Sequence, residues 1–149
     1  MIIETLHWGD LKVEEDQVLQ FAKGIPGFDG ETEFLLIDHE GPFVYLQSVK
    51  DKNLIFLLAD PFYFYPSYEF ELPEGDKEEL VIEDLVKVYG IVTLKEEVKQ
   101  STINLLAPIV INPEKRLGKQ VVLHQTAYQT RHSLWVNHSD STAFGKEGD

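Results

Sequence analysis

The side chains that commonly carry catalysis or bind metals are scattered along this chain. Its histidines stand far apart in the sequence, at His7, His39, His124, His132 and His138. Only the segment Asp38-His39-Glu40 places acids beside a histidine, and successive residues of such a turn point in different directions. The HxH and HExxH spacings of metal sites, the GxSxG nucleophile elbow and cysteine are all missing. The sequence therefore predicts no metal, no cofactor and no enzymatic activity.

Two pairs of nearby glutamates are the remaining candidates for acid–base chemistry. Glu69 and Glu71 alternate with apolar residues, and Glu78 and Glu79 lie in a polar segment. Both pairs are therefore predicted to face solvent and to favour solubility. Hydrolysis of a glycosidic bond needs two carboxyl groups that are close in space, not in sequence. A small β-barrel hydrolase or carbohydrate-binding domain with such a site stays open as the alternative to a binding protein.

Short apolar segments separated by turn residues predict the elements that hold these side chains. About ten short strands and one or two helical turns, one of them at residues 77–80, indicate a mainly antiparallel all-β domain, either a small barrel or a sandwich. Residues 54–59 are entirely apolar and predict a central strand that is buried on both faces. Residues 68–72 alternate and predict a strand with one face in water. Residues 121–124 predict a last strand, paired with residues 109–112.

The stretch from Thr102 to Pro113 is the most unusual strand candidate. Pro108 has no backbone donor and restrains Ala107 to extended geometry. The strand is therefore predicted to break into residues 102–106 and residues 109–112, with a bulge or jog between them. The apolar positions predicted to build the core are Ile103, Leu105, Ile109 and Ile111.

Three segments combine a restrained backbone with side chains suited to binding another protein. The loop from Gly24 to Phe28 brackets Ile-Pro with glycines, so it is predicted to be rigid, with Ile25 and Phe28 either filling the core or presenting an aromatic for docking. The four aromatics of residues 62–65 either cap one end of a barrel or form an interface. The two asparagines of the broken strand are its polar positions. The residues predicted to bind a partner are Gly24, Ile25, Pro26, Gly27, Phe28, Phe62, Tyr63, Tyr65, Asn104, Pro108 and Asn112.

The charge balance favours a protein partner over nucleic acid. Lys plus Arg is 13 against 26 Asp plus Glu, which gives a net charge of −13. Residues 1–100 carry 22 acidic and 8 basic side chains, whereas residues 101–149 carry 4 and 5. An acidic surface repels phosphate backbones and steers basic proteins towards it, although acidity also serves solubility alone.

The length of 149 residues fits one domain, predicted to span residues 1–135 and to be followed by a flexible polar tail at residues 136–149. No apolar run approaches the ~20 residues of a membrane span, and the N-terminus lacks the pattern of a signal peptide. We therefore expect a cytoplasmic protein that contacts neither membrane nor nucleic acid and is a monomer when free.

Five motifs, in their order and spacing, match a known family. They are Phe21-Ala-Lys-Gly-Ile-Pro-Gly-Phe28, Tyr45-Leu-Gln-Ser48, Ala59-Asp-Pro61, Ile91-Val-Thr93 and Thr102-Ile-Asn-Leu-Leu-Ala-Pro-Ile-Val-Ile-Asn112. Over residues 1–135 the chain resembles the flagellar assembly factor FliW family of bacteria. The resemblance implies a compact β-barrel-like fold and a non-enzymatic regulator of flagellum assembly.

The resemblance also implies two protein partners. Members of the FliW family bind newly made flagellin in the cytoplasm as chaperone-like partners. When free of flagellin, they bind CsrA, a small basic dimer that binds RNA and represses flagellin translation. They antagonise CsrA allosterically, so that flagellin synthesis resumes after export.

Overall fold

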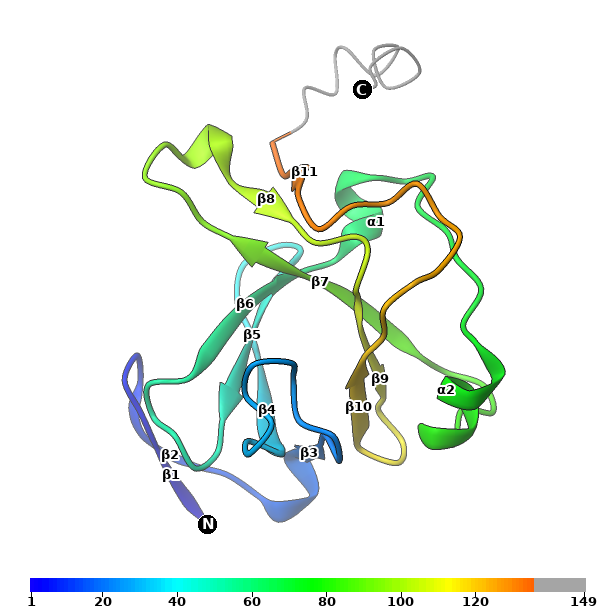
Figure 1. Cartoon of the computed structure of the whole chain (residues 1–149). Helices are drawn as coiled ribbons and strands as arrows, with labels where there is room; N and C mark the ends of the chain where they lie inside the picture. The colour runs from blue at the N-terminus through cyan, green and yellow to red at the C-terminus, as the bar shows by residue number, and fades with distance from the viewer. Residues whose placement is uncertain (136–149) are drawn as a thin grey trace.

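Strands make up most of the regular structure in the computed structural model, which describes residues 1–135 (Figure 1). The strands are β1 (Ile2–Thr5), β2 (Gly9–Lys12), β3 (Val18–Gln20), β4 (Glu33–Asp38), β5 (Phe43–Ser48), β6 (Ile55–Ala59), β7 (Lys87–Thr93), β8 (Thr102–Ile103), β9 (Ile109–Asn112), β10 (Leu117–Gln120) and β11 (His132–Ser133). The helices are α1 (Pro61–Phe64) and α2 (Glu74–Glu79), with 3-10 turns at Glu15–Gln17 and Val98–Gln100. The predicted all-β class is confirmed. The tail predicted at residues 136–149 lies outside the described residues.

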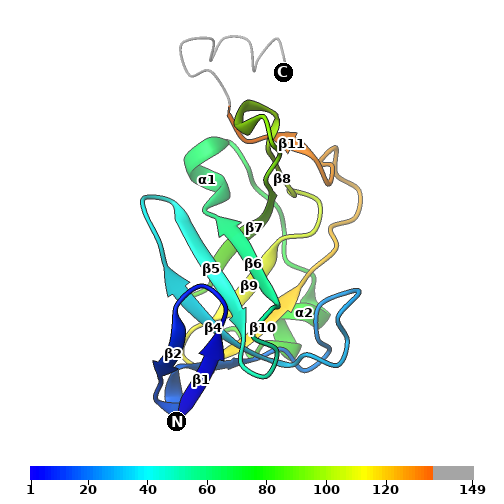
Figure 2. The same cartoon turned by 90° about the vertical axis from the view of Figure 1, so that its left-hand side faces the viewer.

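Seven strands close into a barrel in the order β3-β4-β5-β6-β7-β9-β10, with β7 paired to β9. Neighbouring strands are antiparallel except for β3 and β10, which are parallel and place Leu117 opposite Gln20. The β1–β2 hairpin lies at one end of the barrel, and β8 and β11 lie beyond the other (Figures 1 and 2). Because the ring is closed, each of its seven strands has a paired neighbour on both sides.

The barrel interior is filled by large apolar side chains. Phe21 and Phe34 are fully buried, and their rings meet edge to face with centroids 5.2 Å apart. Gly118 on β10 leaves the space that Phe21 fills, since a Cβ at this glycine would lie 2.3 Å from the Phe21 ring. The buried residues of this core are Leu19, Phe21, Ile25, Phe34, Val44, Leu46, Leu54, Leu58, Ile109 and Ile111.

Strands β8 and β9 are two parts of one interrupted strand along β7, as the sequence predicts. Tyr89 pairs with Ile109 and Val92 pairs with Ile103, so two residues of β7 stand opposite the five of residues 104–108. The first part ends at Ile103, sooner than expected, because the side-chain oxygen of Asn104 accepts the N–H groups of the second and third residues after it, at 3.0 and 2.9 Å. This Asx-type turn competes with continued strand pairing. The four apolar positions predicted for the core are all buried.

The strand predicted at residues 121–124 is wrong. The strand that pairs with β9 is β10, which begins at Leu117, four residues earlier. The side-chain oxygen of Asn112 accepts the N–H groups of Glu114 and Lys115, which tightens the connection and brings Leu117 into register opposite Asn112. Residues 121–124 instead run beyond the strand.

The strand predicted at residues 68–72 is also wrong, although its alternation is correct. Tyr68 is buried, Phe70 and Leu72 are half-buried, and Glu69 and Glu71 are exposed. The segment has no strand partner in the described structure, because the barrel closes without it.

The predicted central strand is confirmed as β6, which lies between β5 and β7. Its burial is less complete than expected. Leu58 and Ala59 are buried, whereas Ile55, Phe56 and Leu57 are half-buried. Apolar composition alone therefore overstated how fully the two faces of this strand are covered.

Candidate protein-binding site

The loop from Gly24 to Phe28 is held in one shape by its backbone. Gly24 and Gly27 have φ values of +66° and +91°, a region that favours glycine. A Cβ at Gly24 would lie 2.8 Å from the backbone of Asp29, so the loop also needs glycine there for space. Ile25 is buried in the core as expected. Phe28 is not in the core: it is 43% exposed and rests edge-on against Phe56, with ring centroids 5.5 Å apart.

Residues 62–64 of the aromatic stretch lie in the short helix α1, and Tyr65 follows its end. Asp60 caps the helix, its Oδ1 accepting the N–H of Phe62 at 2.9 Å. Phe64 is buried against Phe43 and closes this end of the molecule. Phe62 and Tyr63 point outwards, and Tyr63 is 60% exposed. The hydroxyl of Tyr65 donates to the carbonyl of Ser133 at 2.5 Å and ties α1 to β11.

The two asparagines of the interrupted strand hold the backbone. Asn112 is 3% exposed, and its Nδ2 donates to the carbonyls of Leu80 and Val81 at 2.8 and 3.0 Å. Asn104 is half-buried and uses its oxygen in the turn after β8. Pro108 is buried. We therefore assign Asn112 and Pro108, both predicted to bind a partner, structural roles in the free protein.

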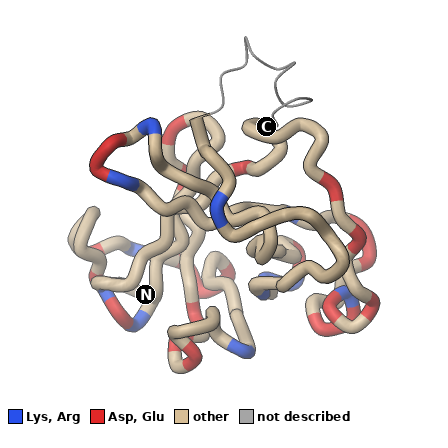
Figure 3. The backbone as a smooth tube through the Cα atoms, turned by 45° about the horizontal axis from the view of Figure 1, so that its top comes forward, with Lys and Arg blue, Asp and Glu red and all other residues tan. Residues whose placement is uncertain are grey.

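The structure does not bring the predicted binding residues into one patch. The loop that carries Phe28 follows β3 towards one end of the barrel, whereas α1 lies with β8 and β11 at the other (Figures 1 and 2). Acidic residues are also spread along the chain on several sides of the molecule (Figure 3). Any partner that contacts both aromatic sites would have to span much of the barrel.

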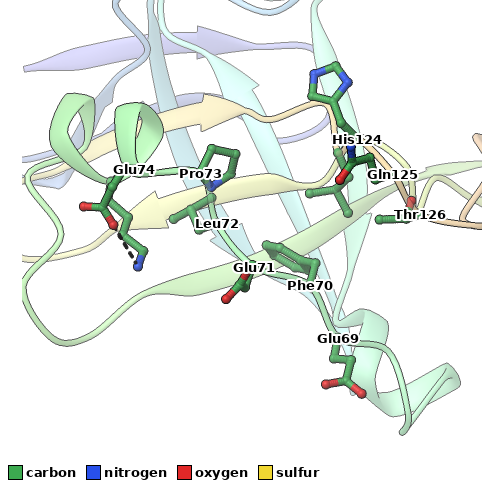
Figure 4. Close-up of a pocket in the computed structure, with 11 residues that line it drawn as sticks. Glu69, Phe70, Glu71, Leu72, Pro73, Glu74, His124, Gln125 and Thr126 are labelled. Atoms are coloured by element: carbon green, nitrogen blue, oxygen red, sulfur yellow. Dashed lines mark ion pairs between the residues drawn. The ribbon is translucent and has the colours of Figure 1, made fainter.

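The described structure also has a surface groove that the sequence does not predict. It has a volume of about 630 Å³ and is lined by Glu69–Glu74, Lys77 and Leu123–Thr126 (Figure 4). We call it the acidic groove. Lys77 Nζ lies 3.5 Å from Glu74, and both side chains are exposed. One wall of the groove is formed by residues 69–74, which overlap the segment whose alternation predicts a surface strand. The alternation alone does not indicate a groove.

Ion pairs hold α2, which borders the acidic groove, onto the barrel. Lys119 Nζ lies 2.5 Å from Asp76 and 2.6 Å from Glu79, and Lys23 lies 3.2 Å from the same Glu79 oxygen. The hydrogen bond from Lys119 lowers the pKa of Glu79. Burial by itself would lower the pKa of Lys119, but its bonds to the two carboxylates outweigh burial and raise it. The helix is therefore fixed at the β10 side.

Within residues 1–135, no group of three or more His, Cys, Asp or Glu side chains is arranged to hold a metal ion. Neither helix of this described part has the length and apolar character needed to cross a membrane.

Comparisons with known proteins agree over nearly the whole described chain. The family model described as FliW protein matches residues 2–134. The flagellar assembly factor FliW of Bacillus subtilis is 43% identical over 138 residues, covering 90% of this chain and 96% of the relative. The corresponding protein of Geobacillus kaustophilus is 45% identical over 138 residues, with 91% and 96% covered. A crystal structure of the flagellar assembly factor FliW matches with a TM-score of 0.87 and 42% identity, over 92% of this chain and 99% of that chain.

Proposed function

This chain belongs to the FliW family of flagellar assembly factors, and from that membership we propose that it regulates flagellum assembly in the cytoplasm by binding two proteins in turn. One partner is flagellin, which it accompanies before export. The other is the translational repressor CsrA, which it antagonises allosterically when flagellin has left. The observation that carries the proposal is the match to flagellar assembly factors over almost the full described chain.

The net charge of −13 supports a basic partner such as CsrA. Acidic surface raises the rate at which a basic protein is captured and disfavours complexes with acidic competitors. It also repels the phosphates of an RNA bound to the same partner. The proposed antagonist therefore has a charge suited to weakening an RNA complex without binding RNA itself.

Exposed aromatic side chains support protein binding at more than one place. Phe28 and Tyr63 are large, are held by ordered backbone, and lie far enough apart in the fold to serve different contacts. Aromatic anchors of this kind often supply much of the affinity of an interface. We therefore keep the Phe28 loop and α1 as the proposed contact sites, and omit Asn112.

Three of the histidines, His7, His39 and His132, make structural contacts in the described part of the chain. His7 and His39 place their rings 5.8 and 5.0 Å from the ring of Tyr45. His132 accepts the N–H of Gln129 on its Nε2 at 2.9 Å. The proposal of a binding protein therefore needs none of these three histidines as a chemical group.

The proposal is tested with purified flagellin and CsrA from the same bacterium. We expect each to form a complex with the full chain in size-exclusion chromatography with light scattering, and flagellin to displace CsrA in a titration. A fluorescent RNA carrying a CsrA site should lose anisotropy when the chain is added to its CsrA complex. If neither protein binds at micromolar concentration, the proposed function is wrong. If CsrA binds but RNA stays bound, the antagonism is wrong while the partner assignment stands.

A further inference from the structure

Part of the backbone in each wall of the acidic groove is left unpaired, although the N–H group of Leu123 donates to the carbonyl of Leu106. On one side, the N–H groups of Phe70, Glu71 and Leu72 donate no hydrogen bond within the described structure. On the other side, the same holds for the N–H groups of His124 and Gln125. Backbone donors and acceptors that are left free along an extended segment form a template onto which another extended segment can pair.

The groove also carries negative charge that the chain does not neutralise. Glu69 and Glu71 are exposed and take part in no ion pair within residues 1–135. Lys77 is the one cation that lines the groove, and it is paired with Glu74. Three carboxylates therefore face one ammonium group, and the two nearest the exposed backbone have no partner. An occupant with basic side chains would satisfy them.

The distance between the two free carboxylates sets the distance between the basic side chains of such an occupant. Residues i and i+2 of an extended segment point to the same face and stand about 7 Å apart, which is twice the rise per residue. Glu69 and Glu71 have this relation, and Figure 4 shows both at the segment that carries Phe70 between them. A paired strand repeats every second residue in the same way, so its basic side chains would have to alternate.

The apolar residues of the groove are suited to contact the side chains of an added strand that alternate with its basic ones. Phe70 and Leu72 are half-buried, and the buried Leu123 lies on the opposite wall. Phe70 is supported by Tyr68, with ring centroids 5.5 Å apart. Phe70 and Leu72 pack against the cluster that contains Leu123, and every second side chain of an added strand would meet the parts of Phe70 and Leu72 that stay exposed.

We propose that the acidic groove binds an extended segment of a partner protein, by strand addition, with basic side chains at alternate positions. The inference rests on the proposed function only in taking the chain to act by binding proteins. It assigns the site and the chemistry of the segment that occupies it. Neither the Phe28 loop nor α1 is part of this site.

The test uses two capped peptides of equal composition. In one, lysine and valine alternate; in the other, all lysines stand together. Each is titrated into the full ¹⁵N-labelled chain and followed by amide chemical shifts. We expect the alternating peptide to shift signals of residues 69–74 and 123–126, and to bind about fivefold more tightly, the effect of one or two solvent-exposed ion pairs. Methylating the backbone nitrogens along one edge of the alternating peptide should abolish binding, because strand addition needs those donors.

Two double variants with the same change in charge test whether the peptide binds at the acidic groove. The double change Glu69→Gln and Glu71→Gln should weaken the alternating peptide about fivefold and remove most of its salt dependence. The control Glu96→Gln and Glu97→Gln removes the same charge from an exposed segment outside the groove and should leave binding unchanged. Equal binding of the two peptides, shifts elsewhere on the barrel, or equal loss in both double variants would each overturn the proposal.

The same double variants, assayed with flagellin and CsrA, separate this inference from the proposed function. If both proteins bind the parent chain while the alternating peptide does not bind, the groove assignment is wrong and the function stands. If the peptide binds as expected while neither protein does, the groove assignment stands and the function is wrong.

Discussion

The side-chain nitrogen of Asn112 donates a hydrogen bond of 2.8 Å to the carbonyl of Leu80, which lies 32 residues earlier in the chain. Through this bond and a second one to Val81, the end of β9 holds the segment that follows α2. Val81 has a φ of +53°, which is uncommon for a β-branched residue, so the conformation there depends on such support. One buried amide thus links the barrel to the segment that follows α2.

We predict that Asn112→Ala lowers the free energy of unfolding by about 2–4 kcal/mol, because it leaves buried carbonyl and N–H groups without partners. Urea denaturation measures the change. The control Asn53→Ala, at an exposed turn residue, should stay within about 0.5 kcal/mol of the parent. An Asn112→Ala protein as stable as the parent would contradict the structural role.

Two glycine-to-alanine changes should act in opposite directions. Gly118→Ala places a methyl group 2.3 Å from the fully buried ring of Phe21, so we expect a loss of about 1–3 kcal/mol in unfolding free energy from overpacking. Gly75→Ala, in helix α2, meets nothing within 4 Å and has no positive φ, so it should gain about 0.5–1 kcal/mol. Thermal unfolding of both proteins tests the pair, and a stabilising Gly118→Ala would refute the close contact with Phe21.

Replacing Lys119 with alanine should lower the free energy of unfolding more than replacing Lys77 with alanine. The side chains of Lys119 and Asp76 are 19% and 16% exposed, and removal of the ammonium group leaves a mostly buried carboxylate unpaired. We expect Lys119→Ala to lower stability by about 1–3 kcal/mol. Lys77→Ala breaks an exposed pair with Glu74 and should change stability by less than about 0.5 kcal/mol. Denaturant titrations at low salt compare the two, and equal effects would remove the special role of Lys119.

Stability should fall as the pH drops below about 6.5, in part because of His132. Burial lowers the pKa of His132 from its ordinary value of 6.5, and the Nε2 that accepts the N–H of Gln129 must be unprotonated. Between the two pKa values the unfolded chain takes up a proton that the folded chain resists, so acid favours unfolding there. We expect His132→Gln to reduce the loss of stability between pH 7.5 and pH 5.5.

The exposed His124 supplies the control for this pH effect. His124→Gln removes one imidazole of the same kind from the surface and should keep the pH dependence of the parent. If the two substitutions give the same pH profile, the decline does not come from His132.

The parts of the fold that depend on local pattern could be predicted from the sequence. The interruption of the strand and the start of its second part at Ile109 were predicted from Pro108, and the four apolar positions expected in the core are buried. The position of β10 was missed because it depends on Asn112, whose side chain caps the turn that follows β9. The pairing of β3 with β10 also could not be predicted, because the parallel pairing of two distant segments produces no local pattern in the sequence of either segment.

The binding site was harder to predict because exposure depends on what packs nearby. The sequence could not separate Phe64, buried against Phe43, from Tyr63 one position earlier, which faces solvent. The acidic groove forms between two segments about fifty residues apart, so neither segment alone signals it. Glu69 and Glu71 were correctly predicted to face solvent. That the backbone beside them is unpaired could be predicted only from the strand order of the closed barrel, which does not include this segment.

Closure of the barrel also sets the order in which the protein can fold. The Arg116 side chain donates to the carbonyl of Glu15 across a separation of 101 residues, beside the pairing of Leu117 with Gln20. Contacts of such high sequence separation slow folding, because a long loop must be closed before they form. While the chain is still being synthesised, β3 has an open edge until β10 has left the ribosome. Nascent chains of this protein should therefore be most prone to aggregation just before their last barrel strand emerges.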